Sequence, residues 1–317
     1  MIKHNIMIIG FGVVGQGFYD LFMEKKDRLS LSNVNISEIV DMRYGLIRDP
    51  KPNVVRSLKP GKHDVNVIEA IRNSDCDIVC EFTWVDYKTG GPGYEHIRES
   101  LTLGKNVLTT NKGPLALHFG ELMSLARSKN CQLKFKGTVM AGTPSFNILE
   151  LLPGIQVKSF RGILNGTTNY ILTRMSQGVL FQDALKEAQS KGYAEADPTN
   201  DVEGYDSRAK CSIVSNVLGW KRSYSDVEVS GISRVSPDEA AAGVKLIAYA
   251  DAREAYVKPV KLQQNDPLRH VDGVTNAIEF ETDTLGRISV FGPGAGSRET
   301  AQAALTDLVS IISYGEG

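Results

Sequence analysis

The sequence has no long apolar run and no strong imbalance of charge. No apolar stretch approaches the roughly 18 residues that a bilayer span needs, and the apolar run at the N-terminus is too short for a signal peptide. The 36 lysines and arginines nearly balance the 37 acids among 317 residues, and no basic run occurs. These absences argue against a membrane protein and against a nucleic-acid partner. We therefore expect a cytoplasmic protein that acts on a small molecule.

Cysteine and histidine are sparse and scattered. The four cysteines include no CxxC pair, and the five histidines show no ligand spacing such as HExxH. Both residue types are therefore expected to be structural or exposed, and we expect no metal site built from them.

The first 135 residues alternate short apolar runs with helix-length segments, the pattern of a parallel sheet with crossover helices. Strands are expected at residues 6–9, 36–40, 77–82, 106–110 and 132–135. Helices are expected at residues 13–29, 94–103 and 115–128. The segment 49–64, rich in proline, lysine and glycine, is expected to be a mobile excursion from this sheet.

After Gly137 potential turns become frequent. Further strands, expected at residues 227–234, 257–262, 277–281 and 288–291, would form a second sheet, and a helix at 301–312 follows. We therefore expect an α/β protein. Its N-terminal Rossmann dinucleotide-binding domain would cover residues 1–136, completed by a C-terminal helix at about 297–317. A second, α+β domain for catalysis and dimerisation would cover 137–296.

A glycine motif, GFGVVG, follows the first expected strand and opens the first expected helix. In this GxGxxG frame the first glycine makes a tight turn, the second lets the backbone approach a pyrophosphate, and the third allows close helix–strand packing. The N–H groups at the helix N-terminus then point at the diphosphate. The residues assigned to this cofactor site are Gly10, Gly12, Val13, Val14 and Gly15.

Two charged residues at the end of the second expected strand bear on the choice of cofactor. Asp41 closes that strand, where an acid would bond the ribose 2′-hydroxyl of NAD, while Arg43 could instead hold the 2′-phosphate of NADP. The residues leave NAD and NADP both open, and we favour NAD because a carboxylate repels a phosphate. Thr83, which directly follows the strand 77–82, is also assigned to the cofactor site.

Five carboxylates and two basic residues crowd the stretch GYAEADPTNDVEGYDSRAK. Within it Asp206 and Lys210 are one helical turn apart, and the same helix face continues through Ile213, Val214 and Val217. The acid and the ammonium therefore lie on the stripe that should be buried. Burying charges is costly unless they are paired, which favours a functional pair over the alternative of an exposed surface ion pair.

A second lysine, Lys112, follows a strand at its carboxyl end in the segment Thr109–Lys112. Open α/β sheets place their ligands at this edge. A solvated lysine at the start of a loop is the alternative.

Taken in order, the segments GFGVVG, TTNKGPLA, TVMAGTP, NGTTNYIL, the acidic stretch and GPGAG resemble one family over nearly the whole chain. That family is homoserine dehydrogenase, and we expect the short, monofunctional form without a fused aspartate kinase or a C-terminal regulatory extension. The resemblance implies the NAD(P)-dependent interconversion of L-homoserine and L-aspartate 4-semialdehyde, in threonine and methionine biosynthesis. It also implies a homodimer formed through the second sheet.

The resemblance further implies roles for individual residues. Lys210 and Lys112 would be the catalytic lysines, with Lys112 also near the cofactor. Reduction of an aldehyde places negative charge on its oxygen, so a cation that can also give a proton is needed there. The residues that would serve the substrate site are Glu195, Asp201 and Asp206. The glycines that would line the cofactor are Gly192, Gly294 and Gly296.

One position departs from the family pattern. Many relatives carry a glutamate at the position of Lys136 and bind an alkali ion there, helped by backbone carbonyls that correspond to those of Val139, Ala141 and Thr143. A lysine ammonium has donors only and is not a cation ligand. Either no ion binds, or the Lys136 ammonium takes its place, as we predict. The alternative is a lysine that points to solvent.

Two other functions fit parts of the sequence. An aspartate-semialdehyde dehydrogenase would need a nucleophilic cysteine, but Cys131 and Cys211 lie in apolar patterns with no sign of an activated thiolate. A catalytically silent dinucleotide-binding sensor would keep the glycine turn. It would not need Lys112, Glu195, Asp206 and Lys210 together.

Overall fold

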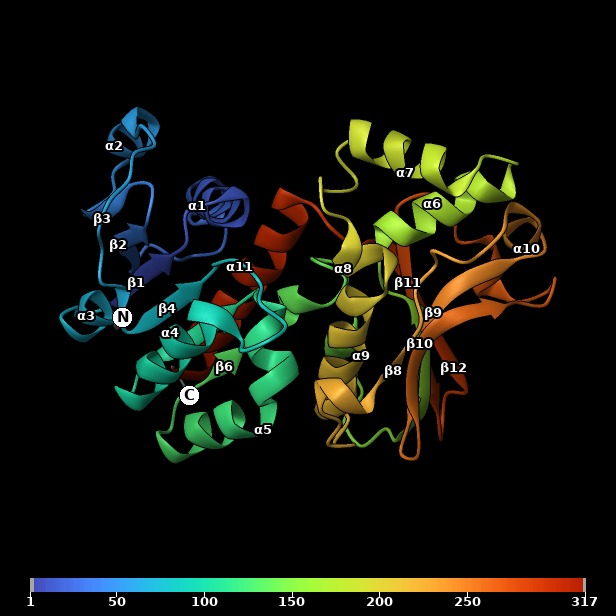
Figure 1. Cartoon of the computed structure of the whole chain (residues 1–317). Helices are drawn as coiled ribbons and strands as arrows, with labels where there is room; N and C mark the ends of the chain where they lie inside the picture. The colour runs from blue at the N-terminus through green and yellow to red at the C-terminus, as the bar shows by residue number, and fades with distance from the viewer. Residues whose placement is uncertain (1–2, 316–317) are drawn as a thin grey trace. The chain divides into compact units, whose positions relative to one another are not determined.

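The computed structural model describes residues 3–315 and divides into two compact units (Figure 1). Unit 1 comprises Met1–Gly142 and Gly296–Gly317, and unit 2 comprises Thr143–Ala295. Each unit contains its own six-stranded sheet. The predicted α/β architecture, a Rossmann domain and a second α+β domain, is confirmed.

The sheet of unit 1 has the strand order β3-β2-β1-β4-β5-β6. Its parallel strands are β1 (His4–Ile9), β2 (Val34–Asp41), β4 (Ile78–Glu81), β5 (Asn106–Thr109) and β6 (Leu133–Lys134). All five were expected from the sequence. The antiparallel edge strand β3 (Gly45–Arg48) was not. The chain leaves β1 toward β2 and later returns to the other side of β1 with β4. This reversal of strand order creates a crevice at the carboxyl ends of β1 and β4, where doubly wound sheets bind their ligands.

Six α-helices belong to the part of unit 1 that the structure describes. They are α1 (Val13–Lys25), α2 (Pro52–Ser57), α3 (Val67–Arg72), α4 (Gly91–Thr102), α5 (Lys112–Ser128) and α11 (Ser297–Gly315). The predicted inward residues of α1, Phe18, Leu21 and Phe22, are buried in one core with Leu305 and Leu308 of α11. The C-terminal helix therefore completes the core of the N-terminal unit.

Several boundaries differ from the sequence prediction. Helix α1 ends at Lys25 rather than near residue 29, and α5 begins at Lys112 rather than 115 because the Asn111 side chain caps it by accepting from Gly113 N. Segment 49–64 contains the short helix α2. Its mobility stays a prediction.

The sheet of unit 2 has the order β12-β11-β7-β9-β10-β8. Its strands are β7 (Val157–Ile163), β8 (Glu228–Val229), β9 (Val244–Asp251), β10 (Ala255–Lys261), β11 (Thr275–Thr282) and β12 (Arg287–Pro293). The second sheet is confirmed, although β7 and β9 were not expected. The predicted strand 227–234 is wrong beyond Val229. At Gly231 the backbone packs closely against Val202, since a Cβ there would lie 2.2 Å from Val202 O.

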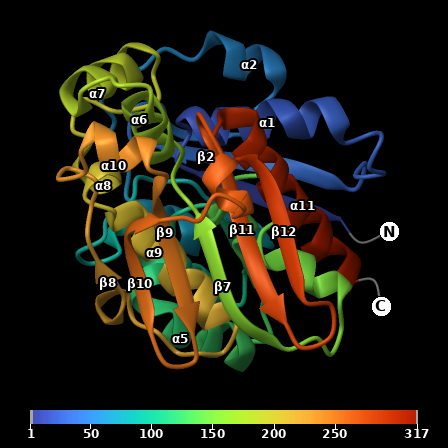
Figure 2. The same cartoon turned by 90° about the vertical axis from the view of Figure 1, so that its right-hand side faces the viewer.

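The helices of unit 2 are α6 (Gly166–Ser176), α7 (Phe181–Ser190), α8 (Thr199–Val202), α9 (Tyr205–Val217) and α10 (Pro237–Ala241). Helices α6, α9 and α10 contact the sheet, and the strands β7, β11 and β12 face the viewer in Figure 2 with no helix in front of them. None of the helices within residues 3–315 is long and apolar enough to cross a membrane.

Candidate active site

The glycine motif forms a tight turn between β1 and α1 in unit 1. Gly10 has φ +85°, and a Cβ there would lie 2.8 Å from the backbone that follows β4. A Cβ at Gly15 would lie 2.2 Å from the carbonyl oxygen of Gly10. Gly12 is the N-cap of α1, no side chain caps this helix, and Val13 and Val14 form its first turn. The turn therefore leaves the backbone open to a diphosphate, and the geometry fits a dinucleotide.

Asp41 and Arg43 hold this turn from the end of β2. Asp41 Oδ2 accepts from Phe11 N at 2.7 Å, and Asp41 Oδ1 accepts from Arg43 N at 2.7 Å and Arg43 Nε at 3.2 Å. The Arg43 guanidinium also donates to Phe11 O at 2.9 Å. Burial opposes ionisation of Asp41, but the hydrogen bonds from Arg43 and Phe11 outweigh it and lower the pKa of the carboxyl. A charged carboxylate and a half-exposed guanidinium thus stand together beside the glycine turn.

Thr83 and Lys112 lie at the same carboxyl edge of the unit 1 sheet. Thr83 follows β4, and its N–H and its hydroxyl both donate to Glu81. Lys112 is the first residue of α5 and is half-buried. The prediction that Lys112 sits at this edge is therefore confirmed, while its catalytic role stays a prediction.

A buried polar cluster of unit 2 surrounds Lys210. Its Nζ lies 2.7 Å from Asp206 Oδ2 and donates to Leu164 O at 2.6 Å. The side chains of Lys210 and Asp206 are only 8% and 11% exposed, and Ile213 and Val214 continue the buried face of α9. The predicted buried pair is confirmed, and the exposed surface pair is excluded.

Asn165 links this pair to Asp201. Its Nδ2 donates to Asp206 Oδ2 at 2.9 Å and to Asp201 Oδ1 at 2.7 Å, while its Oδ1 caps α6 by accepting from Thr168 N. Asn165 was not among the residues expected in the site. Its signal was the position directly before a helix, where asparagine is a preferred N-cap.

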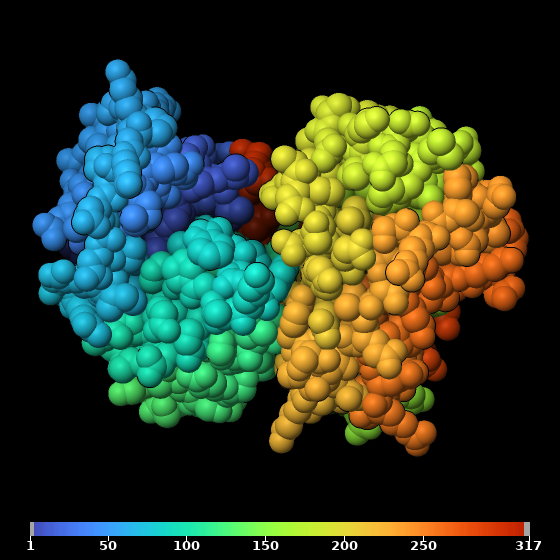
Figure 3. Space-filling view, viewed as in Figure 1, coloured from blue at the N-terminus to red at the C-terminus, as the bar shows by residue number. Residues whose placement is uncertain are grey.

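Other predicted site residues lie outside this cluster. Glu195 and Gly192 are exposed in the segment between α7 and α8, which lies on the surface of unit 2 (Figure 3). The substrate role of the exposed Glu195 stays a prediction. Gly294 allows a close approach in unit 2, since a Cβ there would lie 2.1 Å from the Asn276 amide. Gly296, with φ +131°, belongs to unit 1.

The four cysteines show no activated thiolate. Burial raises the pKa of Cys76, Cys80 and Cys131, and it raises that of Cys211 to about 12. A thiol with a raised pKa stays protonated near neutral pH and is a poor nucleophile. This argues against the chemistry of an aspartate-semialdehyde dehydrogenase.

Lys136 is buried in unit 1. Its backbone N–H donates to Asp307 Oδ2 at 2.8 Å, and its Nζ lies 4.0 Å from Asp307 Oδ1. The side chain is 9% exposed, so the alternative of a lysine that points to solvent is excluded. Of the carbonyls expected around an alkali ion, those of Val139 and Ala141 belong to unit 1 and that of Thr143 to unit 2.

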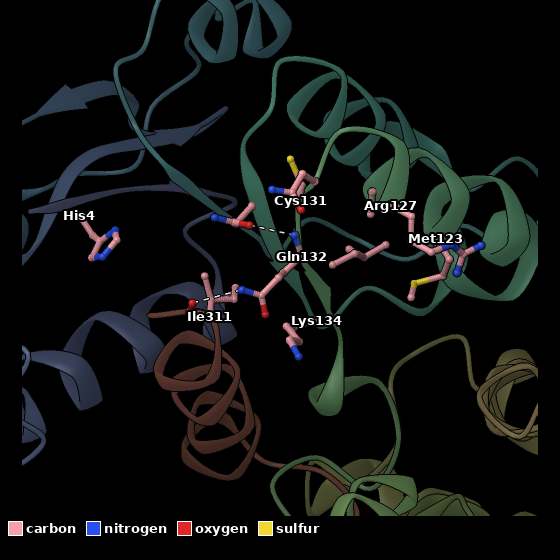
Figure 4. A pocket seen from close by; sticks show the side chains of 11 residues that line it. His4, Met123, Arg127, Cys131, Gln132, Lys134 and Ile311 are labelled. Atoms are coloured by element: carbon pink, nitrogen blue, oxygen red, sulfur yellow. Dashed lines mark hydrogen bonds between the residues drawn. The ribbon is translucent and has the colours of Figure 1, made fainter. Parts of the chain in front are cut away.

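A cavity of about 610 Å³ occurs at the opposite edge of the unit 1 sheet (Figure 4). Its lining includes His4, Asn106 and Leu133, the first residues of β1, β5 and β6. It therefore lies at the amino ends of the strands, away from the glycine turn. Within residues 3–315, no group of three or more histidine, cysteine or acidic side chains is arranged to hold a metal ion.

Comparisons with known proteins match both units of the chain to one family. Residues 10–136 match the family model "Homoserine dehydrogenase, NAD binding domain", and residues 144–309 match "Homoserine dehydrogenase". A homoserine dehydrogenase of Sulfurisphaera tokodaii is 44% identical, over 97% of this chain and 98% of its own. An NAD(+)-dependent homoserine dehydrogenase of Pseudomonas canavaninivorans is 37% identical, over 98% and 97%. The solved structure of a hyperthermophilic archaeal homoserine dehydrogenase in complex with NADPH is 32% identical, with a TM-score of 0.86, over 99% and 98% of the two chains.

We predict that Lys136→Met lowers the free energy of unfolding by about 3 kcal/mol, because breaking a buried pair strands its partner charge. Lys191→Met is the matched control, since Lys191 makes a half-exposed pair with Glu187 at 2.9 Å. That change should cost less than about 1 kcal/mol. Urea unfolding of both variants makes the comparison, and equal losses would contradict the structural role of the Lys136 ammonium.

Proposed function

The chain belongs to the homoserine dehydrogenase family of NAD(P)-dependent oxidoreductases, and we propose that it interconverts L-homoserine and L-aspartate 4-semialdehyde with Lys210 as the proton-transfer group. The observation that carries this proposal is the buried Lys210–Asp206 pair, 2.7 Å apart. A buried ammonium held by a carboxylate and a backbone carbonyl is oriented with little freedom. Such pre-organisation is what a general acid needs.

Within this proposal Lys210, Asp206 and the glycine turn have different roles. The bound nicotinamide supplies or accepts the hydride. In the direction of reduction Lys210 gives its proton to the aldehyde oxygen, and in the direction of oxidation it takes the proton of the homoserine hydroxyl. Asp206 orients the Lys210 side chain through the 2.7 Å contact. The glycine turn binds the diphosphate through the first N–H groups of α1.

We assign three further substrate and cofactor roles by the same proposal. Glu195, Asp201 and Asp206 serve the substrate site, an assignment that rests on the family resemblance and, for Asp201 and Asp206, on their bonds to Asn165. Lys112 serves as the second lysine. The glycines at 192, 294 and 296 line the cofactor.

Lys210→Ala should lower kcat about 10²–10⁴-fold, the usual effect of removing one acid–base group, while the Kd of the dinucleotide changes little. Oxidation of NADH or NADPH with aspartate semialdehyde measures the rate. Lys245→Ala is the matched control, because Lys245 is also a buried ammonium, 2.9 Å from Asp272. It should lose similar stability and keep its kcat. A Lys210→Ala variant with wild-type kcat would contradict the assignment of Lys210 as the proton-transfer group. A wild-type chain that binds dinucleotide without turnover would favour the silent sensor.

We propose NAD as the preferred cofactor, with Arg43 as the residue that lets NADP bind as well. The charged Asp41 can accept from a ribose 2′-hydroxyl, whereas a 2′-phosphate would need the neighbouring guanidinium to offset the repulsion. The NAD(+)-dependent relative and the NADPH-bound relative support both uses.

Asp41→Asn and Arg43→Ala should separate the two cofactors. Asparagine keeps an acceptor for Phe11 N and loses the charge, so it should weaken NADH binding more than NADPH binding. Arg43→Ala should raise the Kd of NADPH about tenfold or more, the scale of one charge-assisted hydrogen bond, and barely change that of NADH. Fluorescence titrations with both cofactors decide, and parallel losses in both variants would mean that neither residue reads the ribose.

We also propose that activity needs no alkali ion, because the ammonium of a lysine has donors only and the Lys136 side chain is buried, with its Nζ 4.0 Å from Asp307 Oδ1. Equal rates in sodium, potassium and choline chloride at one ionic strength would agree with this, and strong activation by one of the alkali ions would contradict it. The cytoplasm remains the expected location.

We propose a homodimer that pairs the open face of the second sheet. The strand registers place one row of side chains on that face, Tyr256, Tyr249, Arg161, Glu279 and Ser289. Phe291 of the edge strand β12 shares the face and is 47% exposed. A half-exposed aromatic on the edge strand of this sheet face fits an interface with a second copy.

Phe291→Glu should therefore shift the protein from dimer to monomer, because the new charges would face each other across the interface. Leu180→Glu, at a leucine that is 63% exposed at the start of α7, is the control and should stay dimeric. Light scattering coupled to size exclusion gives both masses. A monomeric wild type, or two dimeric variants, would contradict this interface.

A further inference from the structure

Glu81 is a fully buried carboxylate in the middle of unit 1. It is the last residue of β4, between β1 and β5, and its exposed fraction is 0%. One oxygen, Oε1, accepts from Thr83 N at 2.9 Å and also from the Thr83 hydroxyl. The other, Oε2, accepts from the Thr109 hydroxyl at 2.9 Å. The carboxylate thus joins the two chain segments that leave the sheet at its ligand-binding edge.

The bond to Thr109 continues to the start of α5. Thr109 Oγ1 accepts from Asn111 N at 3.0 Å, and the Asn111 side chain donates to Trp84 O at 3.0 Å while it caps the helix through Gly113 N. Lys112 is the next residue and the first of α5. The position of Lys112 therefore depends on a hydrogen-bonded chain that begins at Glu81.

Close packing leaves this network little room to adjust. A Cβ at Gly93, in the first turn of α4, would lie 2.5 Å from Asn111 Nδ2 and 3.2 Å from both carboxylate oxygens of Glu81. A Cβ at Gly10 would lie 2.9 Å from Thr83 N. The segment held by Glu81 therefore touches the glycine turn on one side and the cap of α5 on the other.

The chemistry of these partners calls for a carboxylate. Three donors converge on two oxygens, and an ionised carboxyl is the side chain that only accepts. A glutamine could still accept from Thr83, but its NH₂ would take the place of the oxygen that accepts from the Thr109 hydroxyl at 2.9 Å. That hydroxyl would then turn to the backbone carbonyl of residue 81, 3.0 Å away, which reorients the group that accepts from Asn111 N. The first turn of α4 adds the positive end of a helix dipole, which favours the buried negative charge.

We propose that Glu81 is a positioning residue for the dehydrogenase reaction, whose buried carboxylate sets Thr83 beside the glycine turn and Lys112 at the start of α5. This inference rests on the proposed function, because it gives Lys112 and Thr83 their places in that site. Glu81 acts through Thr109 and Asn111 and touches neither substrate nor cofactor.

Glu81→Gln tests this proposal in the full-length protein. It should lower kcat about 10²-fold, because a displacement of about 1 Å in a reacting group has an effect of this size. Glu38→Gln is the matched control. Glu38 is also a buried carboxylate of unit 1 and accepts from a serine hydroxyl, Ser74 Oγ, yet it lies within β2 and away from the ligand edge. It should lose comparable stability and keep its kcat.

Thr109 supplies a second test that leaves Glu81 intact. Thr109→Val removes the hydroxyl with little change of shape and should lower kcat, whereas Thr109→Ser keeps the hydroxyl and should restore it. The double variant Glu81→Gln/Thr109→Val should have nearly the same kcat as Glu81→Gln alone, since both changes remove the hydrogen bond between residues 81 and 109. A role in stability alone would move the unfolding midpoint and leave this kinetic pattern absent.

A spectroscopic measurement reports the same segment directly. Trp84 is 65% exposed and its carbonyl accepts from Asn111, while the other tryptophan, Trp220, stacks on Phe160 in unit 2. In a Trp220→Phe background, Glu81→Gln should shift the Trp84 emission and Glu38→Gln should not.

The outcomes separate this inference from the proposed function. Wild-type turnover of aspartate semialdehyde tests the function by itself. With that activity present, wild-type kcat in both Glu81→Gln and Thr109→Val, or equal kinetic losses in Glu81→Gln and Glu38→Gln, would overturn the positioning role. If Glu81→Gln does not fold, the Thr109 valine and serine variants decide alone.

Discussion

One buried ion pair, Lys210 with Asp206, constrains the loop and the helix of unit 2 that meet around it. Removing two charges from water costs several kcal/mol per ion, which a close partner and further hydrogen bonds must offset. Here the offset comes from the 2.7 Å contact, the Leu164 carbonyl and the Asn165 amide. The loop before α6 and the first turn of α9 must therefore stay in register, because each supplies partners to the other.

Unit 1 uses a comparable device at its own ligand edge. The buried Glu81 carboxyl accepts hydrogen bonds from two threonines, and His96 Nδ1 lies 3.9 Å from its Oε1. Asp41 and Arg43 brace the glycine turn from the other side. In both units buried or half-buried polar side chains fix the loops at the ends of helices and strands. Loop residues have few backbone hydrogen bonds of their own, so these side-chain contacts hold them in position.

The structural features that could be predicted from the sequence are those whose signal lies within a short segment of the chain. The spacing of Asp206, Lys210 and Ile213 predicted a buried helical face, and the glycine motif predicted its turn, because both signals lie within a few neighbouring residues. Strand β9 was missed because a continuous apolar run fits a strand or a buried helix equally well. The partners of Lys210 and Glu81, Leu164 and Thr109, are 46 and 28 residues away. Only the fold brings such residues together.

The central proposal is that Lys210 transfers the proton to and from the substrate oxygen. Chemical rescue of the Lys210→Ala variant tests this role. The turnover of aspartate semialdehyde by Lys210→Ala and Lys112→Ala would be measured across a series of methylamine concentrations at fixed ionic strength. The account predicts that methylamine restores turnover in Lys210→Ala, because a free ammonium can enter the space left by the side chain and supply the proton. Rescue confined to Lys112→Ala, with Lys210→Ala unaffected, would assign the proton to the other lysine and contradict the account.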